Sequence, residues 1–232
     1  MKLDPLKSVP LITIGIPTLN RAHGLARSID SARGRDYPRL EVIVSDNASE
    51  DGTAEICVSY RGRDPRFQCV RLTENQGATA NFMHVLELAS CDYFMWLGDD
   101  DWLDPSYVSR CIEELMANPP LVLASGLAWY YRQGKSQAAG APLEIVAVSW
   151  ARRMLNYDWK VSETGMFYGV MRTAHLRKAG LRKSLGGDWH TIAAVLAGGG
   201  ATTRVDVYVH HELGGASASP AQIAKTPTLP RT

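Results

Sequence analysis

The stretch "WLGDDDWLDP" places three carboxylates, Asp99, Asp100 and Asp101, next to one another directly after an apolar run. Adjacent carboxylates repel each other, most strongly where little water can screen them. One interpretation is a solvated turn in which Asp104 caps a following helix. The other is a site for a hard divalent cation, which takes carboxylate oxygens together with water and phosphate oxygens. Because the triplet follows a buried run, the sequence favours the cation or nucleotide site.

Two more polar segments follow apolar runs. Asn20 lies in "IPTLNR", and Asp46 lies in "VSDNASEDGT". The second segment is also rich in turn residues, so Ser49 or Asp51 could simply cap the next helix. The recurrence of polar residues after successive apolar runs supports a shared binding site.

Three titratable residues of the second half are further candidates. Asp188 opens a helical pattern, so it is either a helix cap or a reactive carboxylate. His210 and His211 end an alternating segment, so one ring faces inward and the other outward. The alternation places His211 on the same face as Val205, Val207 and Val209.

The elements that would position these residues alternate regularly in the first half. Apolar, β-branched runs predict strands at 11–17, 40–45, 67–72 and 93–98, and helical periodicity predicts helices at 21–33, 54–60, 78–90 and 105–118. In the second half we expect strands at 121–132, 166–172 and 202–212, helices at 173–180 and 188–200, and a loop at 133–142. This order predicts an α/β fold with a mostly parallel central sheet flanked by helices. Ligands of such sheets bind at the carboxyl ends of the strands, where the polar segments lie.

The composition of the chain is that of an ordinary globular protein. Its 232 residues are 45% hydrophobic and carry a net charge of +1, which gives no electrostatic basis for binding nucleic acid. The four cysteines include no C-x-x-C pair, and the chain lacks both the apolar core of a signal peptide and a run long enough to span a bilayer. We therefore expect a cytoplasmic protein, with work at the inner face of a membrane left open.

Taken together, these segments resemble the inverting, nucleotide-sugar-dependent glycosyltransferases of family 2, which have the GT-A fold. The resemblance rests on "IPTLNR", "VSDNASEDGT", "ENQGATANF" and "LGDDDWLDP", and more weakly on "GGDWHTIAAVLAGG" and "YVHHELGGASAS". It implies a single GT-A domain over residues 1–213, with a nucleotide-binding half at 1–118 and an acceptor-side half at 119–213. The Ala-, Ser- and Pro-rich segment 214–232 is expected to be a loose tail.

The resemblance also implies roles for individual residues. Asp188 matches the catalytic base of the family. The metal, Mn²⁺ or Mg²⁺, would be held by Asp100, Asp101 and His211, with the register within the triplet left open. The donor site would be formed by Pro17, Thr18, Asn20, Asp46, Asn75 and Asp99. Within it, Asp46 matches the acid that hydrogen-bonds the nucleobase, and Asp99 lies near the ribose.

The implied activity is metal-dependent transfer of a sugar from a UDP- or dTDP-sugar to a saccharide or glycolipid acceptor, with inversion, in polysaccharide or glycoconjugate synthesis. Leu19 stands where many members have an aromatic residue, and Gly187 stands where an acid is common. These departures keep a non-catalytic nucleotide-sugar-binding protein as an alternative. A sugar nucleotidyltransferase is less favoured, because the first strand is not followed by a glycine-rich basic loop. Peripheral membrane association is compatible with this prediction.

Overall fold

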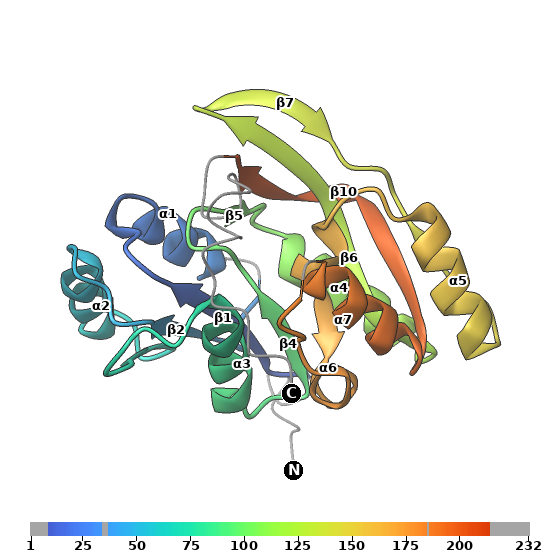
Figure 1. The fold of residues 1–232 in the computed structure, drawn as a ribbon, viewed down its shortest axis with the longest axis horizontal. Helices are drawn as coiled ribbons and strands as arrows, with labels where there is room; N and C mark the ends of the chain where they lie inside the picture. Colours follow the sequence, from blue (N-terminus) through green and yellow to red (C-terminus); the bar gives the residue numbers. More distant parts are fainter. Residues whose placement is uncertain (1–8, 34–36, 185, 214–232) are drawn as a thin grey trace, which may run out of the picture.

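A computed structural model describes residues 9–33, 37–184 and 186–213, so the expected tail at 214–232 lies outside the described residues. Within these ranges the strands form one ten-stranded sheet in the order β3-β2-β1-β4-β9-β6-β10-β5, with β7 paired to β6 and β8 to β10. Helices cover both faces of this sheet (Figure 1).

The first half follows the predicted alternation of strands and helices. Its strands are β1 (Ile12–Thr18), β2 (Leu40–Asp46), β3 (Phe67–Arg71) and β4 (Tyr93–Trp96), and its helices are α1 (Ala22–Ala32), α2 (Thr53–Arg61), α3 (Ala78–Leu88) and α4 (Tyr107–Ala117). All pairings among these four strands are parallel. Thr18 pairs with Asp46 in the register, so the polar segments after β1 and β2 meet at one edge.

The second half extends the sheet with strands of both directions. Its strands are β5 (Trp102–Leu103), β6 (Leu121–Arg132), β7 (Lys135–Ala139), β8 (Glu144–Ile145), β9 (Val170–Arg172) and β10 (Gly200–Glu212). Its helices are α5 (Trp150–Lys160), the 3₁₀ turn η2 (Gly165–Tyr168), α6 (Thr173–Ala179) and α7 (Gly187–Leu196). The long strands β6 and β10 run parallel, and the short strands join antiparallel. The predicted α/β class with a mostly parallel sheet flanked by helices is confirmed.

Several predicted elements of the second half differ from the structure. The expected loop at 133–142 contains strand β7, which forms a hairpin with β6. Gln133 and Gly134 adopt positive φ values of 52° and 72°, which suits the tight turn of such a hairpin. The expected strand at 166–172 is η2 followed by the short strand β9, and the helix expected at 188–200 ends at Leu196.

Two apolar clusters fill the space between the sheet and its helices. One contains inward side chains of α1, α2 and α4, and the other contains those of α3, α5, α6 and α7. Along β4, Tyr93 and Met95 belong to the first cluster, and Phe94 and Trp96 belong to the second, as the pleat of a strand requires. No helix in the described ranges is long and apolar enough to cross a membrane.

Helix α5 is joined to α7 through a buried arginine. The Arg153 guanidinium donates to the carbonyl oxygens of Leu196 at 2.7 Å and Ala197 at 2.9 Å, at the end of α7. It also donates to the carbonyls of Ala147 at 2.9 Å and Val148 at 2.8 Å, just before α5. These bonds satisfy carbonyls that the end of α7 leaves without helical partners, and they fix α5 against α7.

Candidate active site

Helix α1 anchors the aspartate triplet through its main chain. Arg27 Nη2 donates to the carbonyl oxygen of Asp100 at 2.5 Å, and Ser28 Oγ donates to that of Asp101 at 2.6 Å. Gly24 lies so close that an added Cβ would stand 3.0 Å from the carbonyl oxygen of Asp99. Because α1 binds the backbone, the three carboxylates stay free for other partners.

Burial and mutual repulsion make the first two carboxylates of the triplet poor anions. Burial, aided by the neighbouring carboxylate of Asp100, raises the pKa of Asp99 to about 7, while the Arg21 guanidinium opposes this shift. Arg21 Nε lies 3.8 Å from Asp99 Oδ1. The pKa of Asp100 is raised by burial and then by the carboxylate of Asp101. A bound cation would reverse both shifts.

Asp101 is paired with His211 across the sheet. His211 Nδ1 lies 2.8 Å from Asp101 Oδ2, and both side chains are buried. The backbone N–H of Glu212 donates to Asp101 Oδ1 at 3.2 Å, so both oxygens are occupied. A carboxylate accepts hydrogen bonds, so Nδ1 carries the proton and Nε2 keeps its lone pair. His211 Nε2 is buried and has no hydrogen-bond partner in the described part of the chain.

The neighbouring His210 belongs to a separate pair. Its Nε2 lies 2.9 Å from Asp104 Oδ1, and its Nδ1 lies 3.1 Å from the hydroxyl of Tyr131. The ring stacks on Trp102 with centroids 5.1 Å apart. Asp104 also accepts from the N–H of Tyr208 at 2.9 Å, and it does not cap α4 with its side chain. Asp104 therefore fastens β5 to β10, and His210 has both ring nitrogens engaged.

The groups around the triplet fit a hard divalent ion in their chemistry. Among the described residues, no three His, Cys, Asp or Glu side chains already converge in a metal-binding arrangement. Two donors are nevertheless available: His211 Nε2 has no partner, and the carboxylate of Asp100 makes no hydrogen bond or ion pair with any described residue. One or two protein ligands, completed by phosphate and water oxygens, are what Mg²⁺ commonly takes.

The segment after β2 forms the second part of the site. Asp46 is fully buried, and its Oδ1 accepts from the N–H of Ser49 at 2.9 Å. Its Oδ2 has no hydrogen-bond partner among the described residues and lies 3.6 Å from Arg71 Nη1. Asn20 adopts a left-handed φ of 55°. Its N–H donates to Ser49 Oγ at 2.9 Å, and its Oδ1 accepts from the N–H of Glu50 at 2.7 Å. The loops after β1 and β2 are thus bound to each other.

The remaining donor-site candidates lie on the same edge. Pro17 and Thr18 are buried at the end of β1, and the Thr18 hydroxyl has no partner in the described residues. Asn75 Oδ1 accepts from Asn47 Nδ2 at 2.8 Å, which ties the segment before α3 to the loop after β2. Asn81 donates to the Thr18 carbonyl at 3.2 Å and so joins α3 to the end of β1. Hence the structure brings Pro17, Thr18, Asn20, Asp46 and Asn75 to one edge of the sheet.

Asp188 lies at the start of α7, which packs against η2. It is half-buried in the first turn of this helix, where its Oδ1 accepts from the N–H of Trp189 at 2.9 Å, and the residue at the N-cap position is Gly186. Burial raises the pKa of Tyr168 well above its ordinary value, and the carboxylates of Asp101, Asp188, Asp100 and Asp99 raise it further. Helix α7 packs against η2, and the ring of Tyr168 in η2 lies 4.7 Å from the ring of His211, the partner of Asp101.

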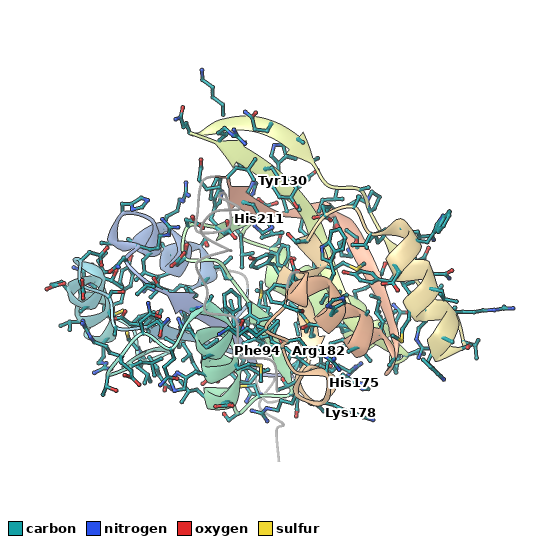
Figure 2. All side chains as sticks on the ribbon, viewed as in Figure 1. Phe94, Tyr130, His175, Lys178, Arg182 and His211 are labelled. Atoms are coloured by element: carbon teal, nitrogen blue, oxygen red, sulfur yellow. The ribbon has the colours of Figure 1, made fainter. Side chains whose placement is uncertain are left out.

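One functional candidate, Tyr130, was not found from the sequence. Tyr130 stacks on His211 with ring centroids 5.3 Å apart, and Figure 2 shows the two side by side. The Tyr130 hydroxyl donates to Glu163 Oε2 at 2.6 Å, and the N–H of Gly165 donates to the same oxygen. These contacts join β6, the segment before η2 and β10, which are far apart in the chain. Only the aromatic run of β6 hints at them, since nothing local in the sequence indicates such a long-range pairing.

Comparison with known proteins places this geometry in a family. The model for "Glycosyl transferase family 2" matches residues 13–180, which is well over half of the chain. The chain belongs to glycosyl transferase family 2. The predicted family and the predicted enzyme class, a glycosyltransferase, are therefore confirmed. Asp188 and His211 lie beyond the matched residues, so their roles stay predictions.

Individual relatives are longer than this chain. Hyaluronan synthase of Pasteurella multocida is 30% identical over 116 residues, which are 50% of this chain and 12% of that protein. Chondroitin synthase of Escherichia coli is 31% identical over 109 residues, or 47% of this chain and 16% of that protein. The matched segments thus cover well under a quarter of the length of these two relatives.

Solved structures support the fold. The structure of S. aureus TarS in complex with UDP-GlcNAc covers 94% of this chain with a TM-score of 0.68 at 17% identity, and the chain covers 62% of it. The mannosyltransferase PcManGT from Pyrobaculum calidifontis, in complex with GDP-Man and Mn²⁺, covers 94% with a TM-score of 0.66 at 20% identity, and the chain covers 61% of it. The GT-A fold expected from the sequence is confirmed.

Proposed function

We propose that this chain transfers a sugar from a nucleotide diphosphate sugar to an acceptor hydroxyl with inversion, and that the reaction depends on a divalent cation. The observation that carries this proposal is the pairing of His211 with Asp101 in the aspartate triplet, on the same side of the sheet as the polar segments that follow β1 and β2. Those segments lie at the carboxyl ends of the strands, the edge at which parallel sheets bind nucleotides. Asp188 lies in the first turn of α7, which packs against η2, and the ring of Tyr168 in η2 lies 4.7 Å from that of His211.

The donor would bind across the ends of β1 and β2. Asp46 offers a hydrogen-bond acceptor that lacks a partner within the described ranges, which suits the N–H of a uracil or thymine base. Asn20 and Asn75 hold the two surrounding loops, so they would shape the base pocket rather than move on binding. Asp99, near the end of β1, would face the ribose. UDP- and dTDP-sugars are the donors we propose.

Asp100 and His211 Nε2 would hold the cation, Mn²⁺ or Mg²⁺, together with the diphosphate. The bound cation would supply stabilisation of the negative charge that develops on the departing diphosphate. Asp101 would contribute through His211, because its two oxygens already accept from the imidazole and from Glu212. A carboxylate in this position fixes the tautomer and the orientation of a ligating histidine.

Asp188 would accept the proton of the acceptor hydroxyl as its oxygen attacks the anomeric carbon. A single displacement of this kind inverts the configuration and forms no covalent enzyme intermediate. The acceptor would be a saccharide or a glycolipid, which agrees with the relatives named as polysaccharide synthases. We accordingly propose a role in polysaccharide or glycoconjugate synthesis at the cytoplasmic face of a membrane.

The proposal is tested by following release of nucleotide diphosphate from a panel of donors. We expect at least one UDP- or dTDP-sugar to be turned over in Mn²⁺ or Mg²⁺, faster with a panel of saccharide acceptors than with water alone. Tight binding of the donor with no release under any of these conditions would instead support a nucleotide-sugar-binding protein.

Replacing Asp46 by Asn should weaken UDP binding about tenfold or more, because the partnerless oxygen becomes a donor that faces the N–H of the base. Calorimetric titration with UDP measures the change. Asn keeps the Oδ1 acceptor for Ser49, so the melting temperature should fall only slightly. Asp51→Asn is the matched control, because Asp51 lies in the same loop and binds Ala22 and Thr53 at the helix starts. Equal UDP affinity in both variants would remove Asp46 from the base site.

A further inference from the structure

Helix α5 and the segment before it expose several large apolar side chains. The exposed fractions are 59% for Val146, 99% for Val148, 61% for Trp150, 68% for Leu155 and 91% for Trp159. A single exposed apolar residue needs no explanation, whereas a group of them on one element marks an interaction surface. We refer to these five residues as the α5 surface.

Three residues of the α5 surface lie in a regular helix, with Leu155 and Trp159 on its outward face and Trp150 at the exposed N-terminal end of the inward face. Arg153 and Tyr157, four residues apart, are buried against the body of the protein. Arg152, Leu155 and Trp159 are spaced by three and four residues and so form a stripe on the opposite side. The outward face of a surface helix is normally polar, whereas the outward face of α5 contains Leu155 and Trp159. Burial of the fold does not account for them.

We propose that the α5 surface docks onto a phospholipid bilayer. Helix α5 lies at the edge of the molecule, on the side away from α2 (Figure 1), and the side chains of the α5 surface are exposed there. A soft bilayer accepts protruding side chains without a complementary groove, which a protein partner would have to provide. With 11 residues, α5 is about 16 Å long and cannot cross the roughly 30 Å hydrocarbon core, so it would lie in the plane of the interface.

The chemistry of the α5 surface matches a membrane interface. Tryptophan is enriched at the level of the lipid headgroups, and Trp150 and Trp159 stand at the two ends of α5. Arg152 and Lys160 are exposed beside them and can extend toward lipid phosphates while their stems cover apolar surface. Asp158 is the one exposed acid of this helix. The insertion of apolar side chains would supply most of the binding, and the two cations would contribute charge complementarity.

Docking through α5 would bring the acceptor side close to lipid. Tyr157, on the inner face of α5, has a pKa raised by burial and then by the carboxylates of Asp188 and Glu163. Only the thickness of one helix, about 10–12 Å, would then separate the bilayer from the region that contains the proposed base. This geometry suits an acceptor held at a membrane by a lipid. That consequence rests on the proposed function, whereas the binding of lipid by α5 does not.

The test is co-sedimentation of the 232-residue chain with vesicles of equal parts phosphatidylcholine and phosphatidylglycerol. We expect the chain to bind the vesicles, and we expect the affinity of the double variant Leu155→Glu, Trp159→Glu to be lower by about tenfold or more. The matched control is Val58→Glu, Met116→Glu, which adds the same charge at apolar positions that are 72% and 52% exposed on α2 and α4. This control should bind vesicles like the unchanged chain.

Equal vesicle binding by the two double variants, or none by the unchanged chain, would overturn the inference. A concentration-dependent dimer, seen by light scattering and lost only in the α5 variant, would assign the surface to a second copy and overturn it as well. Titration of UDP with Mn²⁺ on the same preparations keeps the two proposals apart. Unchanged UDP binding without vesicle binding contradicts the membrane inference alone, and vesicle binding without UDP binding contradicts the proposed function alone.

Discussion

Asp188→Asn is expected to lower the rate of sugar transfer by about 10²–10⁴ while leaving the dissociation constant of the donor nearly unchanged. The amide cannot accept a proton at neutral pH, but it has almost the same shape as the carboxylate. Its oxygen can still accept from the N–H of Trp189, so the start of α7 should survive. The donor would be held by Asp46, the triplet and His211, none of which Asp188 contacts through a hydrogen bond in the described residues.

Turnover and donor affinity should be measured on the same preparation, with nucleotide release as the rate and calorimetry as the affinity. Asp158→Asn is the matched control, because Asp158 is an exposed carboxylate on the neighbouring helix whose charge also reaches Tyr157. It should keep nearly full activity. If Asp188→Asn behaves like this control, Asp188 is not the base. Glu163, which is held by Tyr130 and Gly165 in the same half, is then the next carboxylate to replace.

The first half could be predicted from sequence because its signals are local. The strand runs "LITIGIP" and "LEVIVS" are apolar and β-branched, as expected of strands covered on both faces, and each ends in polar residues at the ligand-binding edge. These runs gave the correct order of elements. They also indicated the edge at which Asp46 and the triplet lie, because parallel strands end together.

Helix α5 and strand β7 could not be predicted in this way because their patterns contradict their environment. The face of α5 toward the protein contains Arg153, whereas the face toward solvent contains Leu155 and Trp159. The distribution of apolar and charged residues along α5 therefore does not indicate which face packs against the protein. All five residues of β7 are exposed, so alternation is absent there too. Both elements depend on tertiary contacts: the arginine bonds to the end of α7, and the hairpin pairing with β6.

The pairing of His211 with Asp101 is a similar case. Sequence alternation put His211 on the face of Val205, Val207 and Val209. His211, Val207 and Val209 are buried, whereas Val205 is exposed at the irregularity in the pairing of β10 with β6. It could not show that β10 bonds to β5 and the triplet, since these segments are about 110 residues apart along the chain. The same distance hid the pairing of His210 with Asp104, which looked like a helix cap from its position before Pro105.

Asp100→Ala is expected to abolish most of the effect of Mn²⁺ on UDP binding. In the presence of the ion the affinity for UDP should fall about tenfold or more, because the variant lacks the proposed carboxylate ligand. In the presence of a chelator the two proteins should bind UDP equally. Arg27 holds the main-chain carbonyl of residue 100, so the loop should keep its position after the side chain is removed.

Without metal, Asp100→Ala should not destabilise the folded protein. Burial and the carboxylate of Asp101 raise the pKa of Asp100, so its ionised form is less favourable in the folded than in the unfolded chain. An acid with a raised pKa lowers stability as the pH rises above its unfolded value. Removing Asp100 removes this cost, so without metal the melting temperature at neutral pH should stay the same or rise. Added Mn²⁺ and UDP should then stabilise the variant much less than the unchanged chain.

This pair of effects separates a ligand from a merely structural acid. A residue that only maintained the fold would lower the melting temperature when replaced, with and without metal alike. Asp92→Ala is the matched control, since Asp92 is an exposed acid just before the opposite end of β4, and it should leave both measurements unchanged. If UDP binds the unchanged chain equally well in Mn²⁺ and in chelator, the triplet does not serve a cation. The unfavourable ionisation of Asp99 and Asp100, which their raised pKa values reflect, would then have to be offset by hydrogen bonds from the ribose hydroxyls of the donor.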